Sequence, residues 1–107
     1  MSKIIKLEVL IAWPPTSKCQ EAIRNLEELV RRHPDELRLL VFKRGIDTCS
    51  ADASIVMKCL IQKSSPVPTC VVNGVFFGSR VVPKLEELEA RVQDILVSTD
   101  EYQKTGS

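Results

Sequence analysis

The first apolar segment of the chain has the two-residue period of a β-strand. Residues 3–12 alternate in part, with Ile5, Leu7, Val9 and Ile11 on one side and Lys6 and Glu8 on the other. Trp13-Pro14-Pro15 follows, and the strand is expected to stop there because proline cannot donate to a sheet ladder. This pattern predicts an N-terminal strand that takes a central place in a sheet.

The next segment has the three-to-four-residue spacing of an amphipathic helix. Thr16 or Ser17 is expected to cap its N-terminus, and His33-Pro34 is expected to end it. Its apolar stripe comprises Ala22, Ile23, Leu26, Leu29 and Val30. Residues 37–42 then predict a second strand, rich enough in apolar side chains to be buried on both faces. A strand–helix–strand unit of this length predicts parallel pairing of the two strands.

The second half of the chain predicts a helix, a hairpin and a last helix. Ser50 is expected to cap a short helix over about 51–62, which would place Cys59 on its apolar side. Two short apolar runs flank Asn73-Gly74, and this dipeptide is a strong hairpin signal because a type I′ turn needs positive φ at both central residues. Pro83 is expected in the first turn of the final helix. The apolar stripe of that helix comprises Leu85, Leu88, Val92, Ile95 and Leu96.

Length and composition indicate one globular domain. The chain has 107 residues, and its 44% hydrophobic and 27% charged fractions are those of an ordinary folded protein. We expect the domain to span residues 1–97 and residues 98–107 to form a polar, disordered tail. The formal charge of +1 gives no reason to expect binding to nucleic acid or to a membrane. The N-terminal apolar run is too short to span a bilayer, so a cytoplasmic location is expected, with the four cysteines as thiols.

The segment from Ser65 to Gly78, with its Val67-Pro68-Thr69 step, resembles the cis-proline loop and following hairpin of the thioredoxin/glutaredoxin superfamily. The resemblance covers essentially residues 3–97. It implies an α/β fold of order β-α-β-α-β-β-α, with a four-stranded mixed sheet in the order 2-1-3-4 and helices on both faces. It also implies that the proline loop faces the start of the first helix, where Thr16-Ser17-Lys18-Cys19 replaces the usual Cys-x-x-Cys.

Cys19 is the candidate catalytic residue. A cysteine in the first turn of a helix lies near free backbone N–H groups, and these favour the thiolate. Thr16 occupies the place of the first cysteine, and its hydroxyl cannot exchange disulfides, so a cycle through an intramolecular disulfide at this motif is excluded. A small core residue is the competing interpretation of Cys19, and a buried strand residue is that of Cys70, the possible resolving thiol. The resemblance implies a substrate-facing wall of Trp13, Thr16, Val67, Pro68 and Thr69.

Two functions remain open on these grounds. The first is a monothiol redox protein that acts through Cys19 on a protein or small-thiol substrate, with glutathione as a possible co-substrate and no bound cofactor. The second is a non-catalytic module that docks an extended segment or a second copy of itself. A metal site is not expected, because the cysteines include no Cys-x-x-Cys pair. The single histidine, His33, is expected at the far end of the helix from Cys19.

Overall fold

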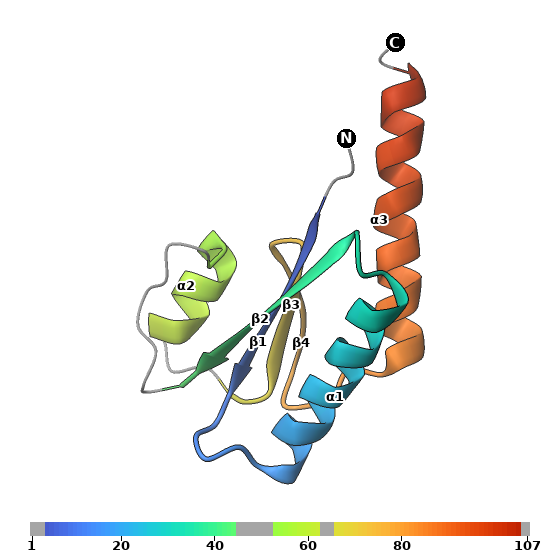
Figure 1. The fold of residues 1–107 in the computed structure, drawn as a ribbon. Coiled ribbons are helices and arrows are strands. Elements are labelled where there is room, and N and C mark those ends of the chain that lie inside the picture. The colour runs from blue at the N-terminus through green and yellow to red at the C-terminus, as the bar shows by residue number, and fades with distance from the viewer. Residues whose placement is uncertain (1–3, 45–52, 63–65, 106–107) are drawn as a thin grey trace.

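The computed structural model describes residues 4–44, 53–62 and 66–105, with side chains described through residue 97. Seven elements follow one another along the chain (Figure 1): β1 (Ile5–Ile11), α1 (Ser17–Arg32), β2 (Leu37–Lys43), α2 (Ile55–Gln62), β3 (Thr69–Val72), β4 (Val75–Ser79) and α3 (Leu85–Thr105). The four strands form one sheet in the order β2-β1-β3-β4. The predicted fold class, element order and sheet order are therefore confirmed.

The sheet is mixed because β1 pairs in opposite senses with its two neighbours. It runs parallel to β2, from Ile5 beside Leu37 to Ile11 beside Lys43, and antiparallel to β3. β3 and β4 form the predicted antiparallel hairpin. Asn73 and Gly74 turn between them with φ of 53° and 78°, the positive values that a type I′ turn requires.

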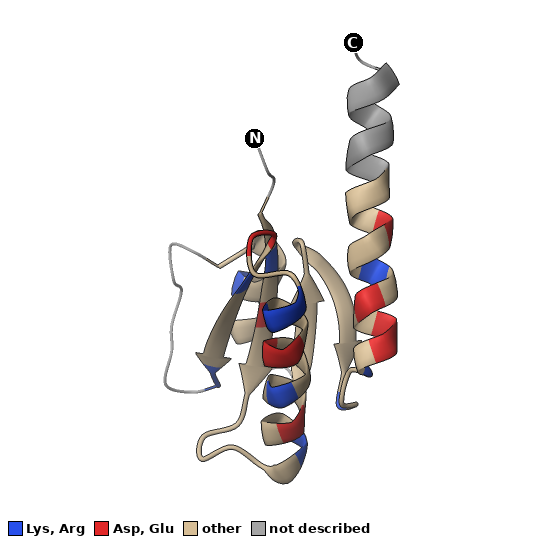
Figure 2. Cartoon of the chain, turned by 45° about the vertical axis from the view of Figure 1, so that its right-hand side comes forward, with Lys and Arg blue, Asp and Glu red and all other residues tan. Residues whose placement is uncertain are grey.

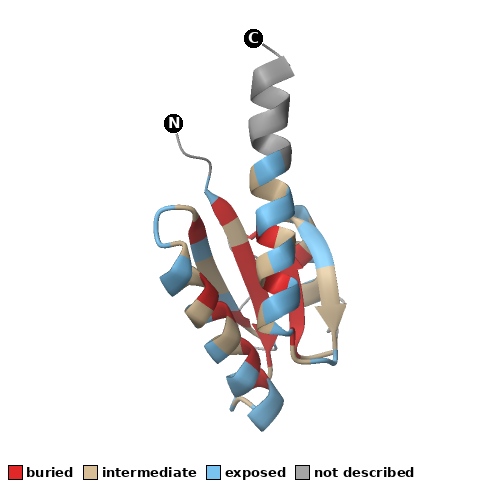
Figure 3. Cartoon of the chain, turned by 90° about the vertical axis from the view of Figure 1, so that its right-hand side faces the viewer, coloured by how far each residue is buried: buried red, intermediate tan, exposed pale blue. Residues whose placement is uncertain are grey.

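The alternation of the strands divides the core into two layers. One face of β1 packs with Leu26 of α1 and Leu88 of α3, and the other face packs with Met57 of α2. Figure 1 shows α1 and α3 on one side of the sheet and α2 on the other, and Figure 3 shows the buried residues concentrated along the central strands. The molecule is thus a three-layer α/β/α arrangement with β1 at its centre.

Polar contacts join α1 to α3. The Asn25 side-chain amide donates to the Pro83 carbonyl oxygen at 2.9 Å, just before α3 begins. At the other end of α1, His33 Nε2 lies 2.7 Å from Glu89 Oε2. The outer face of α1 carries basic and acidic side chains in alternation (Figure 2), as expected of a solvated helix face. These contacts fix α1 beside α3 on one face of the sheet.

Several boundaries differ from the sequence-based expectations. α2 begins only at Ile55, where the Ser54 hydroxyl accepts a hydrogen bond from the Met57 amide, while the expected cap Ser50 lies outside the described residues. α3 begins two residues after Pro83 and continues to Thr105, beyond the expected end at 97. Its last turns contain no proline or glycine before Gly106 to stop the helix.

The prediction that the second strand is buried on both faces is wrong. Only Leu37 and Phe42 of β2 are buried, and Val41 is exposed. β2 forms one edge of the sheet, so among the described strands it has a neighbour on one side only. An apolar run predicts a strand, but its burial depends on what covers it.

Candidate functional site

The loop between β1 and α1 presents the first group of predicted site residues. Thr16 is the N-cap of α1, and its Oγ1 accepts a hydrogen bond from the Cys19 amide at 3.2 Å. Trp13 is 53% exposed, and Lys43 Nζ lies 4.2 Å from the centre of its ring, at cation–π distance. The indole and the Thr16 side chain are therefore on the surface, as a substrate-facing wall would require.

Cys19 lies in the core rather than on this surface. Its side chain is 0% exposed and belongs to the same cluster as Leu26 and Leu29. Both sequence interpretations placed Cys19 in the first turn of the helix, but only the helix packing determines which way it points. The structure places it where a small apolar core residue would be found.

The proline loop has the predicted cis peptide bond, and its side chains face the interior of the protein. The Val67–Pro68 peptide is cis, as predicted, and the Trp13–Pro14 peptide is cis as well. The Pro68 carbonyl accepts a hydrogen bond from the Arg80 amide at 2.9 Å. Pro68 and Thr69 are buried, and Val67 is partly buried between the two core layers.

The Thr69 hydroxyl is satisfied within the protein. It donates to the Pro66 carbonyl oxygen, and it lies 3.1 Å from Ser79 Oγ on β4. These contacts join the loop to the hairpin. The Pro68 carbonyl and the Thr69 hydroxyl thus hold the start of β3 in place, and the two buried residues do not form an open wall beside Trp13.

Cys70 is buried next to Thr69, and its thiol is held in the protonated form. Burial, and secondarily the charge of Glu8, raise the pKa of Cys70 from 9.0 to about 12. A thiol with this pKa supplies very little thiolate at neutral pH, and thiolate is the form that attacks disulfides. Cys70 is therefore poorly suited to the role of a resolving thiol.

The remaining described cysteine, Cys59, lies on α2, on the face of the sheet opposite α1. Cys59 is exposed on α2, so the expectation that it packs on the apolar side of its helix is wrong. α2 is apolar on more than one face, and only the face around Met57 reaches the sheet. Cys49 lies outside the described residues. In the described part of the chain no group of three His, Cys, Asp or Glu side chains could hold a metal ion.

Glu8 is a buried carboxylate in the middle of the central strand. Its side chain is 0% exposed, and its Oε2 accepts a hydrogen bond from the Ser54 amide at 2.8 Å, next to the start of α2. Its Oε1 is buried and has no hydrogen-bond partner among the residues that the structure describes. The alternating sequence pattern gave no sign of this, because a charged residue between apolar ones ordinarily faces solvent.

Strand β4 is the second edge of the sheet, and its exposed side chains are apolar. Val75 is 55% exposed and Phe76 is 49% exposed. The strand sequence Val-Phe-Phe-Gly-Ser contains no charge (Figure 2), and within the described residues only β3 pairs with it. Natural edge strands are usually protected by lysine, proline or a covering segment, because an unprotected edge can pair with a strand of another chain.

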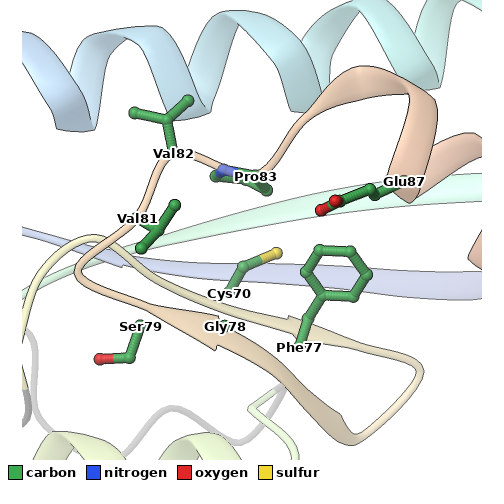
Figure 4. A pocket seen from close by; sticks show the side chains of 8 residues that line it. All are labelled: Cys70, Phe77, Gly78, Ser79, Val81, Val82, Pro83 and Glu87. Atoms are coloured by element: carbon green, nitrogen blue, oxygen red, sulfur yellow. The ribbon is translucent and has the colours of Figure 1, made fainter.

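A small pocket adjoins β4 on the side of α3 (Figure 4). Its volume is about 210 Å³, smaller than the roughly 300–1,000 Å³ of drug-sized ligand sites. The described residues that line it come from the start of β3, from β4, from the connection to α3 and from the first turn of α3: Cys70, Phe77, Gly78, Ser79, Val81, Val82, Pro83 and Glu87.

Sequence reasoning missed both the exposed edge and this pocket. The uncharged apolar run of β4 was visible in the sequence as half of a hairpin. Which of its sides lacks a neighbour depends on strand order, and the pocket depends on where the connection after β4 returns to α3.

Comparison with known proteins adds no assignment. No protein-family model matches the chain, and no curated protein matches it. Among the described residues, no helix combines the length and the apolar character needed to cross a membrane.

Proposed function

We propose that this protein is a non-catalytic interaction module that binds an extended segment of a partner protein along β4. The observation that carries the proposal is the uncharged edge strand with exposed Val75 and Phe76 side chains. An extended peptide adds to such an edge through main-chain hydrogen bonds, and its alternate side chains contact both faces of the sheet.

The state of the cysteines supports a binding role over monothiol chemistry. Cys19 is fully buried, and the high pKa of Cys70 keeps that thiol protonated at neutral pH. A redox cycle through Cys19 would require the first turn of α1 to open, because the attacking sulfur must reach a substrate disulfide. In this proposal the protein shares the architecture of thioredoxin-like proteins but not their thiol chemistry.

The edge also has a neighbouring apolar residue that can add to the contact. Val81, just after β4, is 66% exposed. Val75 and Phe76 lie at the start of β4 and Val81 lies just past its end, so exposed apolar side chains are present at both ends of the strand. Burial of such side chains by a partner is favourable by about 25 cal/mol for each Å² removed from water.

An NMR titration of the full chain with a short peptide tests the proposal. The probe is an acetylated, amidated pentapeptide of alternating threonine and valine with lysine at its centre, which matches the five residues of β4. We expect amide shifts concentrated in β4, and no shifts with the same peptide N-methylated at alternate residues, because it cannot form the ladder. Val75→Lys should weaken binding at least about tenfold, while Val41→Lys on the opposite edge should not.

Two results would overturn the proposal. One is the absence of amide shifts in β4, or shifts of equal size with the N-methylated peptide. The other is a glutathione adduct at Cys19, found by mass spectrometry after exposure of the native protein to glutathione disulfide. That adduct would show that the buried thiol reaches substrate, and it would favour monothiol chemistry.

A further inference from the structure

The pocket beside β4 has the size and the lining of a site for a single side chain. Its apolar walls are formed by the Phe77 ring and by Val81, Val82 and Pro83 (Figure 4). Phe77, Gly78 and Ser79 belong both to the edge strand and to the pocket. A peptide strand paired along β4 therefore brings its own side chains within reach of the pocket.

The charge in the pocket comes from one carboxylate. Glu87 is the only charged side chain among the described residues that line it, and Figure 4 shows this side chain extending from α3 toward the Phe77 ring. Cys70 contributes an uncharged thiol, since its pKa of about 12 keeps it protonated. The pocket thus combines an apolar wall with one negative charge.

We infer that this pocket receives the lysine side chain of the bound segment, an aliphatic chain that ends in an ammonium group. The inference rests on the proposed binding of an extended segment to β4. The methylene groups contact the valine and phenylalanine walls, and the ammonium group pairs with the Glu87 carboxylate. A purely apolar side chain makes no ion pair with that carboxylate, which is on the exposed side of the pocket, and an acidic one is repelled by it.

The neighbouring charges decide which group in the pocket meets the ammonium. The Arg91 guanidinium lies 5.4 Å from the centre of the Phe77 ring, so the ring already has a cation beside it. We therefore assign the ammonium to Glu87, and the ring acts as an apolar wall. The start of α3 would by itself favour an anion, but its first turn carries Glu86 and Glu87, which already supply negative charge there.

The pocket can be tested separately from the strand pairing. Amide and side-chain NMR shifts of the full chain are measured with three probes at matched ionic strength: n-butylammonium, n-butanol and butyrate. We expect n-butylammonium to shift Phe77, Gly78 and Val82 with a saturating, millimolar Kd, as expected of so small a ligand. Butanol and butyrate should bind at least about fivefold more weakly, because butanol carries no positive charge and butyrate is repelled by the carboxylate.

A matched pair of variants assigns the charge. Glu87→Gln should abolish the preference for n-butylammonium over n-butanol, whereas Glu86→Gln, which removes an adjacent exposed carboxylate outside the pocket lining, should retain it. Equal binding of butanol and butylammonium, or no saturating shift at the pocket, would overturn the inference. Retention of the preference in Glu87→Gln would overturn it as well.

The peptide experiment distinguishes the two proposals. If the lysine pentapeptide pairs with β4 and replacement of its lysine by norleucine leaves the affinity unchanged, strand pairing stands and the lysine pocket is refuted. If n-butylammonium binds at the pocket and no peptide shifts β4, the pocket stands as an ammonium site and strand pairing is refuted.

Discussion

Replacement of the buried carboxylate of Glu8 by an apolar side chain is expected to stabilise the protein. Glu8 lies in the centre of β1 with 0% exposure, and within the described part of the chain only its Oε2 has a hydrogen-bond partner, the Ser54 amide. Removal of a charge from water costs several kcal/mol even after relaxation. The hydrogen bond from the Ser54 amide to the carboxylate returns about 1.5–3 kcal/mol of this.

Glu8→Met is the informative change because methionine is similar in length and flexible. It removes the desolvation cost of the carboxylate and leaves the Ser54 amide without its acceptor, which costs about 1–3 kcal/mol. The net expectation is a gain of about 1–3 kcal/mol in the free energy of unfolding, or an increase in Tm of about 4–8 °C for each kcal/mol. Glu8→Gln keeps an acceptor for Ser54 but adds two buried donors, so it should be less stable than Glu8→Met.

Urea unfolding followed by far-UV circular dichroism measures these differences directly. Amide hydrogen exchange in α2 provides a second readout, because loss of the Glu8–Ser54 hydrogen bond should speed exchange at the start of that helix. A Glu8→Met protein that is less stable than wild type by more than about 1 kcal/mol would refute the reasoning. It would mean that the carboxylate holds α2 on the sheet with more free energy than its burial costs.

Three further predictions concern the start of α1 and the cysteines. Thr16→Ala removes the hydroxyl that accepts a hydrogen bond from the Cys19 amide, and it should lower the free energy of unfolding measured in urea by about 1 kcal/mol. Thr16→Ser keeps a hydroxyl and should be close to wild type in stability. Equal losses in the two variants would refute the capping role. The pKa of Cys70 is raised from 9.0 to about 12 in the folded protein. The protonated thiol therefore contributes roughly 4 kcal/mol to the free energy of unfolding below about pH 9, and this contribution is lost as the pH rises to about 12. Cys70→Ala should therefore flatten the alkaline fall in stability over this range, and an unchanged slope would contradict the raised pKa. Iodoacetamide at mildly alkaline pH should label Cys59 rapidly in the native protein and label Cys19 and Cys70 only on unfolding, as peptide mass mapping can verify; rapid native labelling of Cys19 would contradict its burial.

The sequence determined the architecture because its signals are local. Period-two and helical spacing, the caps and the Asn73-Gly74 turn depend on backbone geometry over a few residues, and they predicted each element and the hairpin turn. The strand order came from a family resemblance, and the structure has the same order. The ends of α2 and α3 were less well predicted, because a helix boundary depends on caps that several nearby residues could supply.

The tertiary structure alone decided which chemical groups are accessible. A cysteine in a first helical turn has the same sequence signal whether it faces solvent or the sheet, and packing of α1 turned Cys19 into the core. Packing of α2 likewise buried Glu8 and left Cys59 exposed. The open side of β4 and the pocket beside it arise from segments far apart in the chain, so no local pattern could reveal them. Local spacing fixes the kind of each element, whereas burial is fixed by what lies against it, and accessibility and pKa both follow from burial.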